Sequence, residues 1–403
     1  MTPRKKLGEV LTQVSRPVAV ADLDSVPYAG VRWYAGGVYE RDVVDASSVK
    51  GKTLSRIHTG DIVYNRMWAT KASFGVAGKD VDGCLVTNDF PSFVTTGEAL
   101  DRYVGLLFYD KAFQERASAR ATGTTERRRL KEPDFLDIEV YLPSLPEQQR
   151  IVDLIGSLDE TIEAADEVAM EGRGSLEHFG NDAVERSAAR GWPTVTLSEA
   201  LGEKGVIQTG PFGSQLHQSD YVETGTPVVM PANMRDGQVV LSGMSMIGDS
   251  DVERLSRHRL RSGDIAWSRR GDVTRFAVIG DDEAGMICGT GCLLVRAEQP
   301  ALSAWLAVWL ATTTVSGWLV DNAVGATMAN LNTGILAKVP VSLPPLSERA
   351  SFIGAVEALN SSIEASQSYA ASLRNLRTNL LTALLSGTHE IPVSYDDLLS
   401  EAV

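Results

Sequence analysis

Leu142-Pro-Ser-Leu-Pro-Glu147 and Leu343-Pro-Pro-Leu-Ser-Glu348 are two versions of one segment, 201 residues apart in a chain of 403 residues. When the alignment is carried on to Ala164 and Ala365, it holds eight identities in 23 positions. Self-similarity at a long, fixed spacing indicates an internal duplication, and a duplication decides the architecture before any single element is assigned.

Three further matches lie upstream of this one and occur in the same order in both copies. They are Leu7-Gly-Glu9 with Leu197-Ser-Glu199, Arg56-Ile-His-Thr-Gly-Asp-Ile62 with Arg259-Leu-Arg-Ser-Gly-Asp-Ile265, and Ala121-Thr-Gly123 with Ala323-Val-Gly325. Their offsets drift between 190 and 203 residues, as loop insertions would produce. Four matches in one order predict a chain built from two copies of one half.

Each copy ends in a segment whose apolar residues are spaced alternately by four and three positions. They are Ile151, Ile155, Leu158, Ile162, Ala165 and Ala169 in the first copy, and Phe352, Val356, Leu359, Ile363, Ala370 and Leu373 in the second, where Ser366 interrupts the apolar series. Heptad spacing predicts a helix with one apolar seam. Each helix would have about 40 residues and span about 60 Å.

Antiparallel pairing of the two helices would bury both seams, and two separate helical hairpins are the alternative. Gly172 and Gly174 predict a bend in the first helix. The helices should end near Gly191 and Gly387.

The rest of each copy is typical of short strands mixed with short helices. Apolar runs follow a glycine turn at Asp61–Asn65 and again at Asp264–Ser268. We therefore expect an α+β fold with two repeated mixed α/β domains separated by two long helices that form an antiparallel coiled coil. The expected boundaries are 1–146 and 191–346 for the domains, 147–190 and 347–387 for the helical spacers, and 388–403 for a C-terminal tail.

One segment, Ala301–Val320, contains no charged residue and is long enough to be tested as a membrane span. At an offset of 202 residues it aligns with a segment of the first copy that carries Asp110, Lys111 and Glu115. Because a bilayer would not accept those charges, the alignment predicts a buried helix of a soluble domain.

The formal net charge is −14, which argues against a protein coated in positive charge but leaves room for local phosphate contacts. The three cysteines, Cys84, Cys288 and Cys292, are too few and too irregular for a disulfide framework or a zinc site. They indicate reduced thiols and a cytoplasmic location. We expect no metal and no cofactor.

Several motifs together resemble the specificity subunit of Type I restriction–modification systems. They are Leu142-Pro-Ser-Leu-Pro-Glu-Gln-Gln-Arg-Ile151, Val339-Pro-Val-Ser-Leu-Pro-Pro-Leu-Ser-Glu-Arg349, Gln208-Thr-Gly-Pro-Phe-Gly-Ser214, Gly263-Asp-Ile-Ala-Trp-Ser-Arg269 and Gly325-Ala-Thr-Met-Ala-Asn-Leu331. The duplicated order of domain and helix extends this resemblance over nearly the whole chain.

The resemblance implies that each domain is a target recognition domain for one half of a split site in double-stranded DNA. The helices would set the gap between the halves and dock two methyltransferase (modification) subunits, which restriction subunits join. A subunit of this kind has no catalytic site of its own.

Local basic clusters and polar side chains mark where DNA would be held. Arginine suits guanine, and asparagine or glutamine suits adenine, while other cations contact phosphate. The candidate DNA-binding residues are Asn65, Arg66, Arg127, Arg128, Arg129, Lys131, Gln215, Asn233, Arg235, Arg269, Arg270 and Arg275. A further basic cluster is formed by Arg254, Arg257, His258, Arg259 and Arg261.

Two other classes of function remain as alternatives. The first is a coiled-coil scaffold that presents two binding domains in a related phage-defence complex. The second is an enzyme, against which the sequence argues, because it holds no His-Glu-x-x-His and no Gly-x-Ser-x-Gly element. Ala46–Thr53 resembles a phosphate-binding loop but lacks the helix that must follow one.

Overall fold

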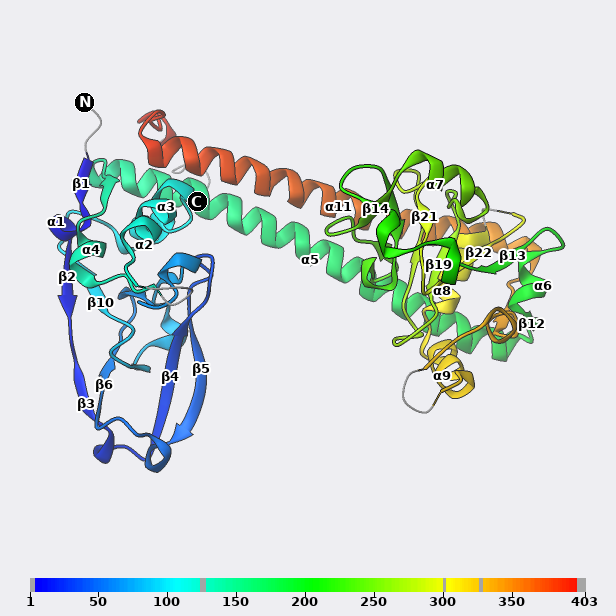
Figure 1. The fold of residues 1–403 in the computed structure, drawn as a ribbon, viewed down its shortest axis with the longest axis horizontal. Helices are drawn as coiled ribbons and strands as arrows, with labels where there is room; N and C mark the ends of the chain where they lie inside the picture. Colours follow the sequence, from blue (N-terminus) through cyan, green and yellow to red (C-terminus); the bar gives the residue numbers. More distant parts are fainter. Residues whose placement is uncertain (1–3, 124–127, 300–301, 326–328, 397–403) are drawn as a thin grey trace. The chain divides into compact units, whose positions relative to one another are not determined.

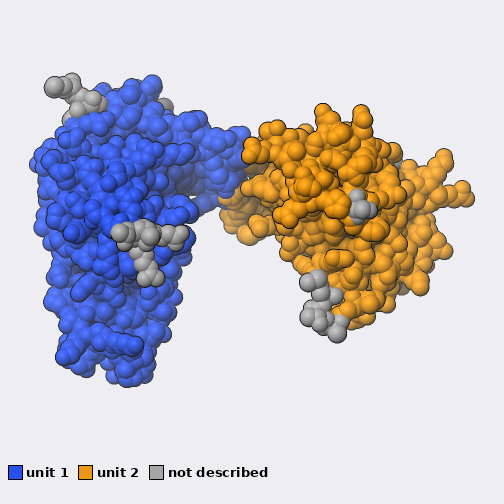
Figure 2. Space-filling view, in the orientation of Figure 1, with its two compact units in different colours: residues 1–164, 369–403 blue, residues 165–368 orange. Residues whose placement is uncertain are grey.

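The computed structural model describes residues 4–123, 128–299, 302–325 and 329–396. Contacts divide the chain into two compact units, coloured in Figure 2. Unit 1 comprises Met1–Ala164 and Tyr369–Val403, and unit 2 comprises Ala165–Ser368.

Two long helices dominate the molecule, α5 (Leu145–Arg190) and α11 (Leu346–Ser386) (Figure 1). In unit 1, the start of α5 packs on the end of α11, where Arg377 pairs with Asp159 at 2.5 Å. In unit 2, the end of α5 packs on the start of α11, where the rings of Phe179 and Phe352 lie 5.6 Å apart. As residue numbers rise along α5, the residue numbers of their partners on α11 fall, so the two helices run antiparallel. The predicted coiled coil is therefore confirmed, and the alternative of two separate hairpins is excluded.

The seam of this coiled coil is buried as the heptads predict. Ile151 and Ile155 lie in the core of unit 1 with Leu381, Leu384 and Leu385. In unit 2, a Cβ atom added at Gly172 would lie 2.7 Å from Cγ1 of Ile363, so this glycine permits close helix approach. Helix α5 is not broken at Gly172 and Gly174, where the sequence predicts a bend, and it runs uninterrupted to Arg190. Gly191, with a φ of +64°, follows the end of the helix.

Both units contain the same four-stranded antiparallel sheet. The order in unit 1 is β2 (Leu11–Val14), β10 (Ser92–Thr95), β7 (Ile62–Tyr64) and β8 (Phe74–Val76). The order in unit 2 is β13 (Val206–Thr209), β22 (Cys292–Arg296), β19 (Ile265–Ser268) and β20 (Phe276–Val278). Equal order and equal strand directions confirm the duplication that the sequence predicts.

A two-stranded sheet ties the start of each domain to the segment that opens its long helix. The pairs are β1 (Arg4–Lys6) with β11 (Glu139–Tyr141), and β12 (Thr194–Thr196) with β23 (Pro340–Ser342). Short helices flank these strands: α1 (Leu7–Val10) and α4 (Glu132–Leu136) in unit 1, and α6 (Leu197–Leu201) and α10 (Thr333–Leu336) in unit 2. In α6 the Thr196 hydroxyl accepts from the Glu199 amide, and the Glu199 carboxylate accepts from the Thr196 amide.

The second sheet of each domain differs between the units. Unit 1 has five strands in the order β3 (Pro17–Ala19), β6 (Thr53–Arg56), β9 (Leu85–Val86), β4 (Ser25–Val31) and β5 (Val38–Asp45). Unit 2 has four, β14 (Tyr221–Val222), β18 (Ser245–Ile247), β15 (Thr226–Val229) and β21 (Ile287–Cys288), beside a hairpin of β16 (Met234–Arg235) and β17 (Gln238–Val239). Both sheets contain a parallel pair, β4 with β9 and β15 with β21, next to an antiparallel pair, β4 with β5 and β15 with β18.

The uncharged segment of the second copy forms two helices instead of the one expected, α8 (Leu302–Leu310) and α9 (Thr313–Asn322), bent by 70°. The hydroxyl of Thr312 accepts from the Val315 amide and starts a new helix. The first copy breaks at the matching place, between α2 (Asp101–Leu107) and α3 (Lys111–Arg120), where Asp110 is the cap. Among the described residues no single helix is long and apolar enough to cross a membrane, and only this bent pair passes by length and composition.

The remaining elements are short. They are α7 (Asp249–Arg254) and the 3-10 turns η1 (Val20–Asp22), η2 (Ala46–Ser48), η3 (Ala69–Lys71), η4 (Lys79–Val81), η5 (Gly213–Gln215), η6 (Gln218–Asp220), η7 (Pro231–Asn233) and η8 (Ser256–His258). The segment that resembles a phosphate-binding loop forms η2 and then strand β6, with no helix after it. It therefore lacks the helix N-terminus that phosphate binding requires.

Candidate nucleic-acid interface

The loops after β7 and β19 occupy equivalent places in the two units. The Leu130 amide donates to the carbonyl of Arg66 at 3.0 Å, and the Leu331 amide donates to the carbonyl of Arg269 at 2.8 Å. Each contact joins the loop to the chain just before α4 or α10. The repeat thus places Arg66 and Arg269, both candidates from the sequence, on matching loops.

The side chains of these two arginines are engaged differently. Arg66 pairs with the carboxylate of Glu132, and its Nε lies 3.1 Å from that carboxylate. Burial raises the pKa of Glu132, but the hydrogen bond and charge of Arg66, together with hydrogen bonds from a backbone amide and from Gln13, hold this pKa below its usual value. Arg269 has no acidic partner among the described residues and donates from Nε to the Leu331 carbonyl at 3.2 Å.

The basic segment of unit 1 is only partly free for DNA. Arg128 donates to the carbonyls of Ser118 and Ala121 and so caps the end of α3. Arg129 lies 3.4 Å from Asp89 with half of its side chain exposed, and Lys131 is exposed with no ion pair to a described residue. Arg127 lies outside the described residues.

Three cations of unit 2 reach the surface. Arg235 and Arg270 are exposed and form no ion pair with the residues that the structure describes. Arg275 lies 3.5 Å from Asp272 and also donates to the Pro231 carbonyl. Arg235 and Arg275 line one open pocket of about 640 Å³ beside the β16–β17 hairpin. Of the predicted residues, these two are brought together.

The predicted amide side chains are mostly committed to turns. Oδ1 of Asn65 accepts from the Met67 amide, and Oδ1 of Asn233 accepts from the Met230 amide. Both residues are buried, at 8% and 6% exposure. Gln215 is half-buried, and its Oε1 accepts from the Phe212 amide at 3.3 Å.

A pair of buried carboxylates explains the repeated Gly-Asp-Ile motif, which the sequence marks without showing its role. Asp61 accepts two hydrogen bonds from Arg16, at 2.5 and 3.1 Å, and Asp264 accepts two from Arg296, at 2.7 and 2.5 Å. Each carboxylate also accepts from a backbone amide three residues earlier, at His58 and Arg261. These contacts fix the turn from which each candidate loop emerges.

His258 is the buried centre of the basic cluster on unit 2. Its ring is 1% exposed and its Nε2 accepts from Nε of Arg257 at 3.0 Å. Burial, and then the charge of Arg257, lower the pKa of His258 to about 4. The ring is therefore neutral at pH 7 and adds no positive charge to the basic cluster.

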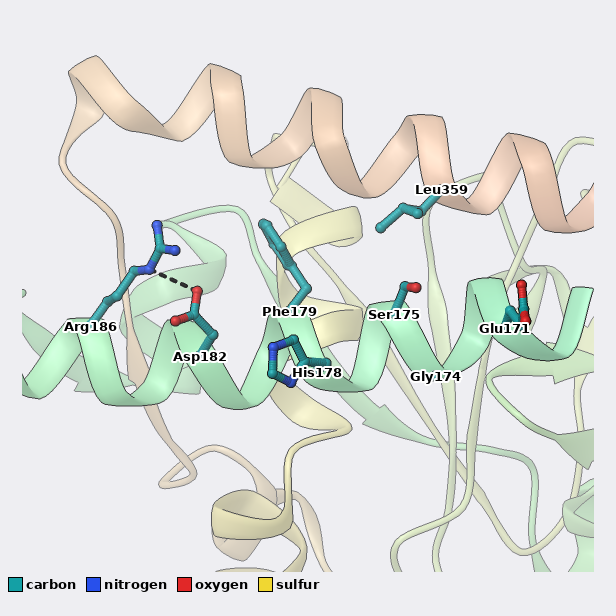
Figure 3. A pocket seen from close by; sticks show the side chains of 8 residues that line it. All are labelled: Glu171, Gly174, Ser175, His178, Phe179, Asp182, Arg186 and Leu359. Atoms are coloured by element: carbon teal, nitrogen blue, oxygen red, sulfur yellow. Dashed lines mark ion pairs between the residues drawn. The ribbon is translucent and has the colours of Figure 1, made fainter. Parts of the chain in front are cut away.

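Unit 2 also has an open groove of about 780 Å³ along the helix pair (Figure 3). Gly174 and Ser175 leave it open because their side chains are small, and Phe179 and Leu359 line it from the two helices. Arg186 beside it is paired with Asp182 at 2.7 Å. The groove therefore holds no free cation among the described residues and is a poor place for DNA.

The described residues contain no group of three or more His, Cys, Asp or Glu side chains that could hold a metal ion. Cys84, Cys288 and Cys292 are free and buried.

The chain is similar to two specificity subunits of Type I restriction enzymes. It is 21% identical over 301 residues to the MjaVIII specificity subunit of Methanocaldococcus jannaschii, which covers 70% of this chain and 69% of that one. It is 24% identical over 187 residues to the EcoBI specificity subunit of Escherichia coli, which covers 45% of this chain and 38% of that one. No family model matches the chain.

Solved structures agree with these sequence matches in fold. The S subunit of a Type I restriction–modification system from M. genitalium has a TM-score of 0.55 at 13% identity, with 95% of this chain and 96% of that one covered. A chain from a solved type I R-M system has a TM-score of 0.53 at 18% identity, with 95% and 97% covered. The resemblance to the specificity subunits of Type I restriction–modification systems is thus confirmed, and the duplicated fold of this chain is the fold of that family.

Proposed function

We propose that this chain is the non-catalytic subunit that gives a Type I restriction–modification complex its DNA sequence specificity. Domains 1–146 and 191–346 each contact one half of a bipartite site in double-stranded DNA. The observation that carries the proposal is the duplication of one sheet, one turn and one loop, at Asp61–Arg66 and Asp264–Arg269. Two equivalent surfaces on one chain suit a site with two halves.

Exposed cations provide the phosphate contacts on which affinity for DNA depends. In the second domain these are Arg235, Arg270 and Arg275, and in the first they are Arg129 and Lys131. Arg66 and Arg128 shape their loops instead, since each is held by acceptors of its own domain. Because the chain as a whole is acidic, its affinity for DNA in isolation is weak and falls steeply with salt.

The helical spacers 147–190 and 347–387 set the gap between the two half-sites and dock two methyltransferase subunits, to which restriction subunits bind. The described start of the C-terminal tail contacts the first spacer: the Ile391 amide donates to Glu147 at 2.9 Å. The complex acts in the cytoplasm, to which three free buried cysteines are suited.

The direct test is to co-express the chain with its methyltransferase subunit and to sequence the modified DNA of the host. The proposal predicts one bipartite methylated motif with a fixed gap. A stable complex without any motif would favour the scaffold function, and failure to form a complex would refute the docking role of the helices.

Charge reversal separates DNA contact from assembly. Arg235→Glu with Arg270→Glu should lower the affinity of the assembled complex for DNA at least tenfold and leave subunit assembly intact, because neither side chain is engaged in an ion pair with the described residues. Lys204→Glu is the matched control, since Lys204 is 85% exposed at its side chain and belongs to the same domain. A scaffold without DNA contact would show no difference between the two proteins.

A further inference from the structure

An exposed aromatic cluster lies on unit 1 where β4 turns into β5. The connecting residues Arg32-Trp-Tyr-Ala-Gly-Gly37 place Trp33 and Tyr34 at the surface, with 47% and 68% of each residue exposed. The Trp33 ring lies 5.1 Å from that of Trp68, which precedes η3, and 6.5 Å from that of Tyr34. We call Trp33, Tyr34 and Trp68 the aromatic cluster.

The backbone under this cluster is strained. Four described residues other than glycine have positive φ angles, and three of them lie here: Tyr34 and Ala35 at 57°, and Ala72 at 51°. In this conformation the Cβ atom crowds a carbonyl oxygen, which costs free energy in every residue except glycine. Strained residues persist only where their surroundings hold them, and they gather at functional sites.

The structure holds this strain through specific contacts. The Tyr34 amide donates to the Lys71 carbonyl at 2.8 Å, and the Ala35 amide donates to the Ala72 carbonyl at 2.7 Å. Both alanines are 3% exposed and belong to the core of unit 1. The buried alanines anchor the turn, and the aromatic rings beside them are left in fixed positions at the surface.

The charges around the cluster favour an anionic partner. Segments 32–37 and 66–76 contain Arg32, Arg66 and Lys71 but no Asp or Glu, in a chain whose net charge is −14. Arg66 is paired with Glu132, and the Arg32 guanidinium lies 4.3 Å from the centre of the Tyr39 ring. Arg32, next to Trp33 in the chain, and Lys71, three residues after Trp68, are both exposed. Nucleobases stack on aromatic side chains while neighbouring cations contact the backbone phosphates.

The cluster also adjoins the cations assigned to DNA in the first domain. The Leu130 amide bonds to the carbonyl of Arg66, two residues before Trp68. Arg129 and Lys131 flank Leu130 in the chain. The side chain of Arg129 is half exposed, and Lys131 forms no ion pair with a described residue. The rings and these cations thus lie on neighbouring segments of unit 1.

We propose that Trp33, Tyr34 and Trp68 form a stacking surface for a nucleobase that is unstacked from the duplex at the half-site that the first domain contacts, with Arg32 and Lys71 on its flanking phosphates. The inference rests on the proposed function and deepens it, because it assigns a specific contact to one of the two domains.

The direct test is photochemical crosslinking of the complex of this chain with its methyltransferase subunit. The probe is a duplex that carries the methylated motif, with 5-iodouracil in place of thymine at one position in each sample. We expect crosslinks within the peptides that contain Trp33, Tyr34 or Trp68 for positions of one half-site. Crosslinks confined to other peptides would overturn the inference.

Binding by variants of the same complex provides the second test. Trp33→Leu with Tyr34→Asn should weaken binding of the motif duplex roughly tenfold to a hundredfold, the effect of losing one base-stacking contact. Trp33→Phe with Tyr34→Phe keeps two rings and should restore most of the affinity. Val43→Ala is the control, since Val43 is an exposed apolar residue of β5, 56% accessible, away from the connection.

The outcomes separate this inference from the proposed function. If the unmutated complex does not prefer the motif duplex to a scrambled one, the proposed function fails. If it does prefer the motif but the Leu/Asn variant binds equally well, only the stacking surface is wrong. Loss of subunit assembly in that variant would assign the cluster to a protein partner and would also overturn the inference.

Discussion

The two domains share one sheet but differ in the connection between two neighbouring strands of the second sheet. In unit 1, β4 and β5 are joined by six residues that expose two aromatic rings. In unit 2, β15 and β18 are joined by fifteen residues, 230–244, which include the β16–β17 hairpin and the exposed Arg235. The common parts are buried and the different parts are at the surface. A duplicated scaffold with unlike connections suits two surfaces that contact unlike DNA sequences.

The buried carboxylates are a feature of the shared turn that both copies keep. Asp61 and Asp264 occupy the same turn, yet Arg16 precedes β3 whereas Arg296 ends β22. Each guanidinium also donates to an equivalent carbonyl, of Arg56 and of Arg259. The same charge therefore reaches the same place from two different segments of the fold. A buried acid in this turn requires a cation, whichever segment supplies it.

The largest effect is expected from removing these carboxylates. Asp264→Ala should lower the free energy of unfolding by roughly 3 kcal/mol, because it leaves a largely buried arginine unpaired. Asp61→Ala should cost less, roughly 2 kcal/mol, since its arginine is 32% exposed against 18% for Arg296. Urea unfolding of each variant measures the difference. Asp42→Ala is the surface control, and an equal loss in all three proteins would contradict the account.

The second prediction concerns the pH dependence of stability, and it applies to unit 2, which contains His258. The pKa of His258 is about 4 in the fold against 6.5 in the unfolded chain, so the unfolded chain takes up the proton first as the pH falls. The stability that neutral His258 contributes is complete above pH 6.5 and is lost progressively between pH 6.5 and 4. The loss should amount to roughly 3 kcal/mol, since each pH unit between the two pKa values corresponds to about 1.36 kcal/mol.

The measurement is the free energy of unfolding of unit 2 at several pH values in that window. His258→Ser removes the titrating group, and Ser55 occupies the matching position in the first copy. The variant should show a shallower slope against pH than the unmutated chain. Equal slopes would mean that His258 titrates alike in the folded and unfolded chains.

The third prediction compares two glycines within one turn of α5. Gly174 has no atom near the place where a Cβ would lie, so Gly174→Ala should stabilise unit 2 by about 0.5 to 1 kcal/mol through helix propensity. Gly172→Ala should gain nothing or destabilise, because its Cβ would meet the buried Ile363. Thermal unfolding of both variants tests the helix pairing, and an equal gain would show that α11 does not approach Gly172.

The smallest effect is expected from relief of backbone strain. Tyr34→Gly should stabilise unit 1 by up to about 1 kcal/mol, because glycine adopts a positive φ without strain. Asp236→Gly, at the tip of the hairpin in unit 2, should change less, since aspartate tolerates this conformation better than tyrosine. Thermal unfolding of the two variants gives the comparison, and destabilisation by Tyr34→Gly would refute the strain under the aromatic cluster.

The sequence predicted those parts of the fold that follow from a repeated pattern. The heptads from Ile151 to Ala169 predicted the seam of α5, because burial of one helix face leaves a regular spacing. It did not predict the break at Thr312, because the run Thr312-Thr313-Thr314 marks a helix start only once one of its hydroxyls finds an amide. Nor did it show that Gly172 serves close packing, which depends on Ile363 nearly 200 residues away.

The candidate site was predicted less well than the fold. The repeat located the loops of Arg66 and Arg269, but no local pattern shows that Glu132 pairs with Arg66. The amides of Asn65 and Asn233 serve turns, a use that sequence does not distinguish from base contact. The consecutive Trp33 and Tyr34 before Gly36-Gly37 were the available signal for an exposed aromatic turn.

The most direct measurement of the central claim is the methylated motif produced by the complex when the first domain carries Trp33→Leu and Tyr34→Asn. The DNA of cells that express this variant with the methyltransferase subunit is sequenced beside that of cells with the unmutated chain. We expect one half of the motif to become degenerate or undermethylated, while the other half and the gap stay unchanged. A change in both halves, or in the gap, would contradict the assignment of one half-site to each domain.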